Sequence, residues 1–543
     1  MKKWTLLILS ALITGLWSCK QEDKKREEAE KKEAETLSEQ EEKISTNVMS
    51  AELLWKLGRV NADVQVSPDG KKVLYGVSRY KLEENSGQSD LFLVDVETGE
   101  SKNITSTEDE SESNARWRPD GEKIGFLAKD DNDHMQLWEM DAEGGGKTMI
   151  SEVEGGIKGF EYSPGLKHIL YIKDVKLDET ANEKYPDLPK ANARIIDDMM
   201  YRHWDAWHDY KYSHVFYASY KDGGLTEHKD IMEGERFDSP LNPWGGMEQI
   251  TWSPDGSKIA YVAKKLTGKE YTVSTNSEIY IYDLETGETE NLTKEKFDGY
   301  DHDPVYSPDG KMIAWKSMAT PGFESDKERI IVKNLETGEI NDMSEKFDQS
   351  SHGFVWSEDA SKLYFISGIH ATYQIYELDV KSGEIRQITE GKHNYVSVAP
   401  AGDKLIGAKQ SMALPTEIFT ITMGGQEEQL SHVNDDMLEE ITLAHSEERW
   451  VETTDGKKML VWVIYPPNFD KNKKYPALLY CQGGPQSAVS QFFSYRWNFQ
   501  MMAAHDYIVV APNRRGLPSF GQEWNDQISG DYGGQNIRDY MSA

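Results

Sequence analysis

Short apolar segments alternate with tight polar turns along most of this chain. Seven times an apolar segment runs into a turn and out into a second apolar segment. Proline at the second turn position presets φ, while Asp and Gly suit the remaining corners. The turns are Ser67-Pro68-Asp69-Gly70, Arg118-Pro119-Asp120-Gly121, Ser163-Pro164-Gly165, Ser253-Pro254-Asp255-Gly256, Ser307-Pro308-Asp309-Gly310, Ser357-Glu358-Asp359-Ala360 and Ala399-Pro400-Ala401-Gly402. The pattern predicts seven β-hairpins in series.

A second series of strand-like segments interleaves with the first, and most of its members close in a Thr-Gly-Glu or similar turn. Its members are Leu91 to Glu100, Gln136 to Gly145, His214 to Gly224, Glu278 to Glu288, Arg329 to Glu339, Gln374 to Glu384 and Glu417 to Gly425. The two series together make seven four-stranded units. The turns recur every 42 to 54 residues, apart from one step of 90. This spacing is typical of a β-propeller.

The doubled step has two interpretations, an eighth blade or an insertion of about 40 residues within the third. We favour the insertion, at about 174–213, because the second half of the third unit arrives late, at His214 to Gly224. The inserted residues are rich in aromatic and charged side chains, which favours a structured loop or short helix over a flexible linker. His203, Asp205, His208 and His214 match no standard spacing of metal ligands.

The periodicity changes after Glu448. Trp450 to Thr454 and Met459 to Tyr465 predict a hairpin, and the apolar run from Ala477 to Cys481 predicts a strand covered on both faces. On this interpretation Cys481 is a small core residue. An amphipathic stretch from Tyr495 to His505 and a buried strand from Tyr507 to Ala511 then open an α/β domain.

The N-terminus predicts a lipoprotein. Two lysines precede an apolar run that ends in Ser18-Cys19, which resembles a bacterial lipobox; an ordinary cleaved signal with a chance cysteine is the alternative. Residues 20–45 are almost all Lys, Glu, Gln and Ala and predict a solvated tether. We therefore expect lipidation at Cys19 and a place in the bacterial cell envelope, facing the periplasm or the cell surface. A net charge of −33 argues against nucleic-acid binding.

These patterns divide the chain into a signal peptide (1–18), a charged tether (19–47), a propeller (48–435) and the start of an α/β-hydrolase domain (436–543). The predicted fold class is an all-β seven-bladed β-propeller followed by the N-terminal part of an α/β-hydrolase domain.

Gln482-Gly483-Gly484-Pro485 follows the first predicted buried strand of the hydrolase part. An α/β-hydrolase places there the loop that lends a backbone N–H to the oxyanion hole, and glycine lets the main chain approach a reacting carbonyl. Alone, Gly-Gly-Pro is only a tight turn. The nucleophile elbow G-x-S-x-G occurs nowhere in the 543 residues. We therefore expect the chain to be cut off before its catalytic triad and to be inactive alone.

The turns, the Gly-Gly-Pro loop, Asn513-Arg514-Arg515-Gly516 and the lipobox together resemble the prolyl oligopeptidase family. Within that family, Tyr201-Arg202-His203-Trp204-Asp205 is similar to bacterial dipeptidyl-peptidase V type members. The resemblance implies a serine peptidase whose propeller caps the active site and admits short peptides. Gly483 and Gly484 match the family's oxyanion-loop glycines, whereas Gln482 stands where relatives carry His or Tyr.

An exopeptidase that releases dipeptides must bind a free ammonium, which a carboxylate does best. Asp197, Asp198 and Asp205 in the insertion are candidates, and Arg202 either orients one of them or contacts a substrate carbonyl. An Arg-Asp pair that only fixes the loop is an equal alternative. We expect no cofactor and no metal. The competing function is a non-catalytic propeller lipoprotein that acts as a binding module.

Overall fold

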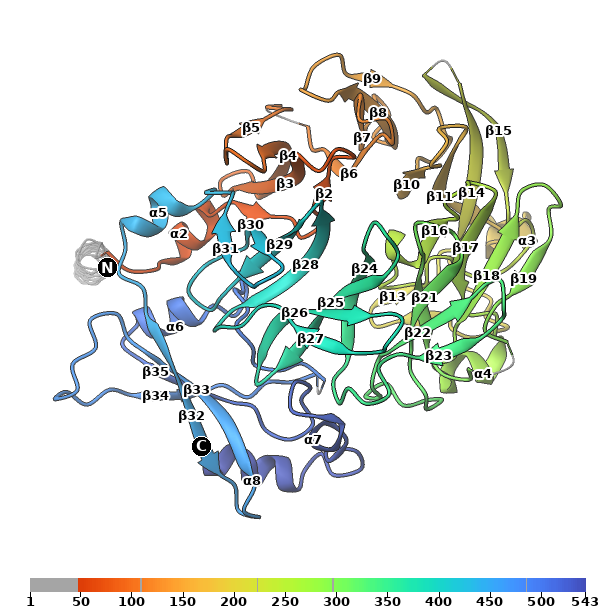
Figure 1. Ribbon diagram of the computed structural model, residues 1–543. Coiled ribbons are helices and arrows are strands. Elements are labelled where there is room, and N and C mark those ends of the chain that lie inside the picture. Colours follow the sequence, from red (N-terminus) through yellow and green to blue (C-terminus); the bar gives the residue numbers. More distant parts are fainter. Residues whose placement is uncertain (1–46, 108–109, 222, 295–296, 485) are drawn as a thin grey trace, which may run out of the picture.

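The computed structural model describes residues 47–107, 110–221, 223–294, 297–484 and 486–543. Cys19 and the tether lie outside these residues. The described part consists of a ring of β-sheets with a smaller α/β portion, residues 445–543, on one side of it (Figure 1).

The ring contains seven blades among the described residues: blade 1 has five strands, each of the others has four, and blades 6 and 7 are joined into one eight-stranded sheet. Blades 1 to 3 comprise β1 (Arg59–Val60), β2 (Gln65–Val66), β3 (Lys72–Lys81), β4 (Ser86–Asp95), β5 (Ser101–Asn103); β6 (Ser113–Trp117), β7 (Lys123–Lys129), β8 (Met135–Asp141), β9 (Thr148–Met149); and β10 (Gly159–Tyr162), β11 (His168–Lys176), β14 (Lys211–Lys221), β15 (Gly224–Asp230). Blades 4 and 5 comprise β16 (Ile250–Trp252), β17 (Lys258–Ala263), β18 (Glu278–Asp283), β19 (Thr289–Asn291); and β20 (Asp301–Tyr306), β21 (Met312–Ser317), β22 (Arg329–Asn334), β23 (Ile340–Asp342). Blades 6 and 7 comprise β24 (Ser351–Trp356), β25 (Lys362–Ile369), β26 (Thr372–Asp379), β27 (Ile385–Gln387); and β28 (Asn394–Ala401), β29 (Lys404–Gln410), β30 (Glu417–Thr422), β31 (Glu427–Gln429).

The predicted seven-bladed propeller is confirmed, and so is the single interrupted third blade. Strands β10, β11, β14 and β15 form one sheet, with residues 177–210 inserted between its second and third strands. This insertion contains the short helix α3 (Ala181–Lys184) and a small hairpin of β12 (Arg202–His203) and β13 (Ala206–Trp207).

The recurring Ser-x-Asp turns close the first hairpin of a blade by one mechanism. In blades 1, 4, 5 and 6 the serine Oγ donates to the aspartate two residues on, at 2.6–2.7 Å. The same Oγ accepts the backbone N–H five residues on, at 2.9–3.0 Å. The fourth turn residue has a positive φ of 58–74° in these blades, which glycine adopts without strain and which Ala360 adopts in blade 6.

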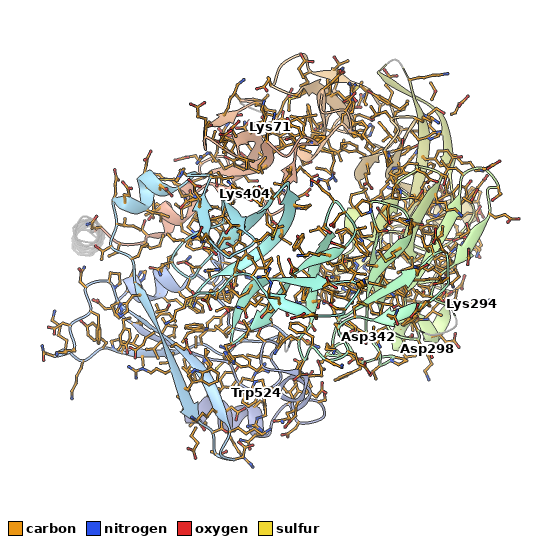
Figure 2. The ribbon with its side chains drawn as sticks, viewed as in Figure 1. Lys71, Lys294, Asp298, Asp342, Lys404 and Trp524 are labelled. Atoms are coloured by element: carbon orange, nitrogen blue, oxygen red, sulfur yellow. The ribbon has the colours of Figure 1, made fainter. Side chains whose placement is uncertain are left out.

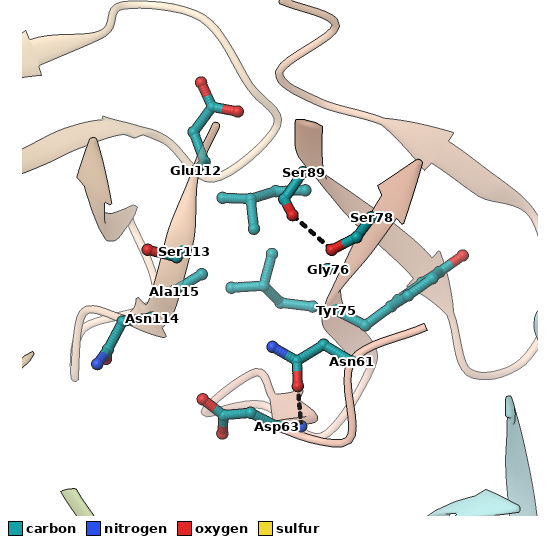
Figure 3. A pocket seen from close by; sticks show the side chains of 12 residues that line it. Asn61, Asp63, Tyr75, Gly76, Ser78, Ser89, Glu112, Ser113, Asn114 and Ala115 are labelled. Carbon is teal, nitrogen blue, oxygen red and sulfur yellow. Dashed lines mark hydrogen bonds between the residues drawn. The ribbon is translucent and has the colours of Figure 1, made fainter. Parts of the chain in front are cut away.

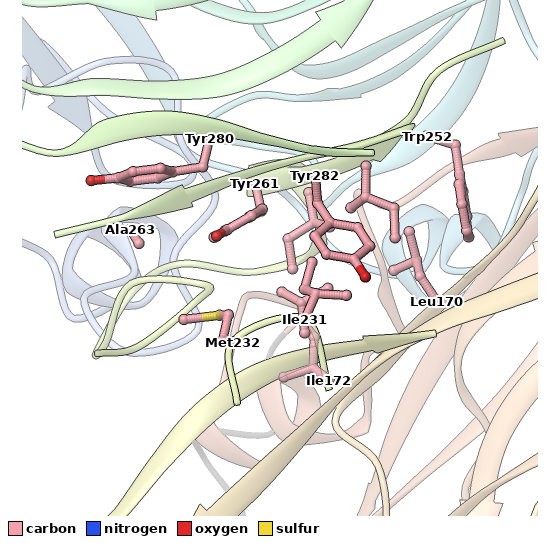
Figure 4. Packing of buried hydrophobic residues seen from close by; sticks show 12 residues of the cluster. Leu170, Ile172, Ile231, Met232, Trp252, Tyr261, Ala263, Tyr280 and Tyr282 are labelled. Atoms are coloured by element: carbon pink, nitrogen blue, oxygen red, sulfur yellow. The ribbon is translucent and has the colours of Figure 1, made fainter. Parts of the chain in front are cut away.

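Neighbouring blades are held together by seven clusters of buried apolar side chains, one at each junction. Figure 4 shows the cluster between blades 3 and 4, where Leu170 and Ile172 meet Trp252 and Tyr282. The cluster that closes the ring joins Val73 and Tyr75 of blade 1 to residues of blade 7. Lys71 and Lys404, labelled in Figure 2, follow the first turns of these two blades.

A buried asparagine strengthens this closure. Asn434, which is 1% exposed, lies between blade 7 and helix α5 (Asp435–Glu439). Its Oδ1 accepts the N–H of Gly58 at 2.7 Å, and its Nδ2 donates to the carbonyl of Gly58 at 2.9 Å. Gly58 follows helix α2 (Ala51–Lys56), so the two hydrogen bonds tie the start of the propeller to its end.

The α/β portion is a four-stranded sheet in the order β32 (His445–Glu452), β33 (Lys458–Tyr465), β35 (Ile508–Pro512) and β34 (Ala477–Leu479). Strands β34 and β35 run parallel, and helix α6 (Phe499–Ala504) packs on β33 and β35. Helices α7 (Gln522–Asp526) and α8 (Gln535–Ser542) follow. The predicted hairpin and the β-loop-α-β order are confirmed.

The prediction that the strand from Ala477 is covered on both faces is wrong in this structure. Strand β34 is the edge of the described sheet and pairs only with β35 there. Leu478 and Leu479 are 37% and 43% exposed, and Cys481 is exposed rather than a core residue. An apolar run shows that a strand tolerates burial on both sides, but it does not provide the neighbour that buries it.

The direction of the blades determines what lies at each end of the ring. In an antiparallel blade the first and third turns lie at one end, and the connection between the second and third strands lies at the other. The latter end contacts the α/β portion: Ser325 of blade 5 accepts hydrogen bonds from Gln522 and Asn525, at 2.8 and 2.6 Å. In blade 6, His370 N–H donates to the carbonyl of Ser519 at 2.9 Å. The insertion of blade 3 occupies this same end.

Among the described residues, no helix combines the length and apolar character needed to cross a membrane.

We expect the Asn434→Ala variant to lose about 2–3 kcal/mol of unfolding free energy, because both backbone groups of Gly58 lose a buried partner. Equilibrium denaturation of the purified protein measures this change. The matched control is Asn132→Ala at an exposed hairpin tip, which should change the unfolding free energy by less than about 0.5 kcal/mol. Equal losses in the two variants would show that Asn434 does not close the ring.

Candidate functional site

The glycine loop predicted to bind an oxyanion, residues 482–484, directly follows Cys481 at the carboxyl end of the β34 segment. Gly483 and Gly484 are exposed, and Gly484 has a φ of +100°. A Cβ built on Gly483 meets no heavy atom within 4 Å. Within the described residues neither glycine N–H has a hydrogen-bond partner. Two backbone donors are therefore available to a ligand carbonyl at the surface of this loop.

The carbonyl of Gln482 is held from two directions. Arg514 Nη2 donates to it at 3.1 Å, and Tyr540 OH donates to it at 2.9 Å. Arg514 Nε also donates to the Tyr540 oxygen at 3.2 Å, so the three groups form a closed triangle. Burial raises the pKa of Tyr540, with Arg514 opposing that shift, so the phenol keeps its proton at neutral pH.

Asn513, which is fully buried, holds Val489, five residues after Gly484. Its Oδ1 accepts the N–H of Val489 at 2.9 Å, and its Nδ2 donates to the Val489 carbonyl at 3.1 Å. Trp462 Nε1 donates to the same carbonyl at 2.8 Å. Asn513 and Arg514 are consecutive, so one short segment after β35 contacts both Gln482 and Val489, before and after the two glycines.

Arg515 fixes that segment to the rest of the α/β portion. Its guanidinium makes two hydrogen bonds to Asp539, at 2.7 and 3.0 Å, and two to Asp455, at 2.9 and 3.0 Å. Asp539 is fully buried on α8, and Asp455 lies in the β32–β33 turn. Hydrogen bonds from Arg515 and Thr453 hold the pKa of Asp455 far below its usual range. Two-fold bidentate pairing gives the guanidinium a single orientation.

The four substrate-binding candidates of the insertion are all exposed and do not form one cluster. Asp198 Oδ1 accepts the N–H of Gly268 at 2.6 Å and thereby ties the insertion to helix α4 (Gly268–Val273) of blade 4. The guanidinium of Arg202 lies 5.7 Å from the ring centre of Trp207, across the small hairpin. Asp197 and Asp205 have no hydrogen bond or ion pair within the part of the chain that the structure describes.

The insertion also presents a group of exposed aromatic rings. Tyr201 and Trp207 stack at 5.9 Å, and Trp204 meets Trp244, which lies between β15 and β16, edge to face at 5.3 Å. Trp204 and Trp244 are 70% and 74% exposed. The predicted structured loop is therefore present, and its rings face solvent at the end of the ring that contacts the α/β portion.

The same end contains the buried charge cluster of blades 5 and 6. Glu328 lies 3.2 Å from His302 Nε2, 2.9 Å from His352 Nδ1 and 3.9 Å from Lys316 Nζ. Burial alone would raise the pKa of Glu328, but the charges of Lys316 and His352 hold it well below its usual value. Since Asp303 pairs with Lys316 at 2.8 Å, the charges in this cluster are mutually compensated.

A small pocket lies between blades 1 and 2, lined by polar groups that include Asn61, Asp63 and Glu112 (Figure 3). Ser78 and Ser89 share a hydrogen bond of 2.5 Å in its wall. Its volume of about 50 Å³ is far below the several hundred Å³ of a typical ligand site. It has room for water molecules and not for a peptide.

Comparison with known proteins gives these features a context. Residues 249–460 match the model of the TolB beta propeller domain, and residues 493–543 match the model of the Prolyl oligopeptidase family. Over 496 residues the chain is 45% identical to a protein named dipeptidyl-peptidase 5 from Porphyromonas gingivalis, covering 91% of this chain and 72% of that protein. A second dipeptidyl-peptidase 5, from Porphyromonas endodontalis, is 42% identical with 92% and 72% covered.

The chain belongs to the prolyl oligopeptidase family. It is accordingly a serine-type peptidase, which excludes the non-catalytic binding module as its function. Among solved structures, an acylaminoacyl peptidase from Pyrococcus horikoshii superposes with a TM-score of 0.73 at 19% identity, covering 91% of this chain and 71% of that one. That likeness supports the propeller-hydrolase fold alone.

The sequence pointed to the glycine loop but not to its supports. Arg514 belongs to a motif that contributes to the family resemblance, but the motif assigns it no function. Tyr540 lies 58 positions after Gln482. The sequence offers one indication: Arg514 is a cationic residue shortly after a predicted buried strand, in a chain with a large negative charge. No spacing rule links that residue to a carbonyl in another loop.

We expect Gly516→Ala to destabilise the α/β portion by about 3–5 kcal/mol. Gly516 has a φ of +91°, and a Cβ there would lie 2.6 Å from Ile528 and 2.8 Å from Arg514 Nη1. Gly530→Ala is the matched control, since Gly530 has a φ of +73° but no atom within 4 Å of its Cβ position. It should cost about 1 kcal/mol of backbone strain. Denaturation followed by tryptophan fluorescence compares the unfolding free energies of the two variants. Equal losses would show that the collision with Arg514 and Ile528 does not add to the backbone strain.

Proposed function

We propose that this chain is the larger part of a serine exopeptidase that releases dipeptides from the free amino termini of short peptides. The observation that carries the proposal is its 45% identity, over 91% of its length, to a dipeptidyl-peptidase 5. The glycine loop, whose two N–H groups have no partner among the described residues, supplies the oxyanion donors of such an enzyme.

The nucleophile and its base belong to sequence that these 543 residues do not contain, since no G-x-S-x-G occurs in them. Donors that stabilise an oxyanion cannot form an acyl-enzyme without a nucleophile and a general base. We therefore propose that the 543-residue polypeptide is inactive by itself. The propeller restricts access by covering the site, because the end of the ring that contacts the α/β portion also carries the insertion.

Recognition of the substrate ammonium belongs to that insertion in our proposal. Asp198 is occupied by Gly268, which leaves the carboxylates of Asp197 and Asp205 available for a cation. Both are exposed in this structure, so a bound peptide must exclude water from them for the pair to be strong.

A version of the protein extended through a G-x-S-x-G elbow tests the activity. We expect it to cleave dipeptidyl-p-nitroanilides with a free amine about 100-fold faster, by kcat/KM, than their N-acetylated forms, because an acetyl group removes the charge that a carboxylate binds. Asp197→Asn or Asp205→Asn should raise KM about tenfold. Asp198→Asn is the control, since its amide oxygen still accepts from Gly268. Equal cleavage of acetylated substrates would instead indicate an acylaminoacyl peptidase.

We further propose that the protein is anchored in the bacterial cell envelope through a lipid on Cys19, on the basis of the lipobox resemblance and the solvated tether. Expressed with its signal in a bacterial host, the mature protein should partition with membranes, and mass spectrometry should find an acylated N-terminal Cys19. A Cys19→Ser variant should be released. An unmodified Cys19, or a mature N-terminus elsewhere, would contradict the proposal.

A further inference from the structure

The peptide unit between Gln482 and Gly483 connects the two sides of the candidate oxyanion loop. A trans peptide is planar, so the carbonyl of Gln482 and the N–H of Gly483 point in opposite directions and rotate together. On one side, the carbonyl accepts from Arg514 and Tyr540, at 3.1 and 2.9 Å. On the other side, the N–H of Gly483 has no partner among the described residues. The orientation of the open donor is therefore determined by the two side chains behind it.

We propose that Arg514 and Tyr540 are positioning residues that aim the Gly483 N–H at the substrate carbonyl. The binding of a substrate carbonyl by this N–H rests on the proposed function. The hydrogen bonds of Arg514 and Tyr540 to Gln482 do not depend on it.

Glycine needs such support more than any other residue. Gly483 and Gly484 have the largest backbone freedom available, and both lie at the surface. An oxyanion donor contributes to catalysis only if it is oriented before negative charge develops on the substrate oxygen. Reorienting the donor during the reaction would cost free energy that offsets the stabilisation from its hydrogen bond. Two donors on one carbonyl restrict the peptide plane to one orientation. Asn513 additionally holds Val489, five residues after Gly484, by two hydrogen bonds.

The positioning groups are themselves held rigidly. Arg514 is 4% exposed, its Nη1 donates to the carbonyl of Arg515 at 2.8 Å, and its own carbonyl accepts from Trp524 Nε1 at 3.1 Å. Arg515 is fixed in turn by Asp455 and Asp539. The hydrogen bonds thus run from α8 and the β32–β33 turn to the glycine loop, and a change in either is transmitted to the Gly483 donor.

The first test measures the order of the loop in the 543-residue chain. The sequence contains two cysteines, so a Cys19→Ser background leaves Cys481, exposed and next to Gln482, as the one thiol for a nitroxide spin label. Tyr540→Phe removes the hydroxyl that donates to the Gln482 carbonyl. Arg514→Lys replaces the planar guanidinium, which donates to the same carbonyl, with a single ammonium group. We expect each to shorten the rotational correlation time of the label by roughly twofold or more, with thermal unfolding nearly unchanged for Tyr540→Phe.

Tyr507→Phe and Arg496→Gln are the matched controls, because both side chains are exposed and neither contacts Gln482. Their spectra should equal that of the parent. Unchanged label mobility in both Tyr540→Phe and Arg514→Lys would overturn the proposal, whatever the activity of the enzyme.

The second test uses the extended protein with its nucleophile. Tyr540→Phe should lower kcat by roughly tenfold and leave KM within about twofold, because the aimed donor acts on the transition state. A looser loop with an unchanged kcat would show that the two residues only hold the structure together, which overturns their positioning role. An extended parent without any peptidase activity would refute the proposed function, while the spin-label result would still decide the contacts.

Discussion

The antiparallel order of strands within each blade is the constraint on which the rest of this molecule depends. It sends the connection between the second and third strands of all seven blades to one end of the ring. That end contacts the α/β portion through blades 5 and 6, and it carries the insertion of blade 3. The glycine loop of the α/β portion and the insertion of blade 3 thus belong to the two parts of the molecule that meet at this end of the ring.

Within the α/β portion, hydrogen bonds between buried polar groups hold the site in place, whereas apolar packing holds the blades of the propeller together. Seven apolar clusters hold the blades together and leave their ends free to vary. In the segment Asn513-Arg514-Arg515-Gly516, in contrast, each side chain has a specific polar partner. Gly516 leaves free the space in which a Cβ would collide with Arg514 Nη1 and Ile528. Apolar packing tolerates exchange of similar volumes, whereas these directional contacts do not.

Local chemistry explains which features could be predicted from the sequence. The propeller followed from its turns, because Ser, Pro, Asp and Gly act on residues up to five positions away. The insertion followed from a break in that period. The clamp of Asn434 on Gly58 spans 376 positions, and the contact of Tyr540 with Gln482 spans 58, so neither leaves a local pattern. The exposure of β34 was missed for a related reason: a strand's own apolar residues do not identify its neighbours. Where the insertion's Asp197 and Asp205 act remains a prediction.

A fluorophosphonate probe, which reacts only with an activated serine, tests whether the nucleophile lies outside these 543 residues. Two preparations are compared, the 543-residue polypeptide and a version extended through the following coding sequence. We expect no labelled serine in the shorter protein and one in the longer, within a G-x-S-x-G that begins within roughly 50 residues after Ala543. Stoichiometric labelling of the 543-residue chain, or an extension without that elbow, would contradict it.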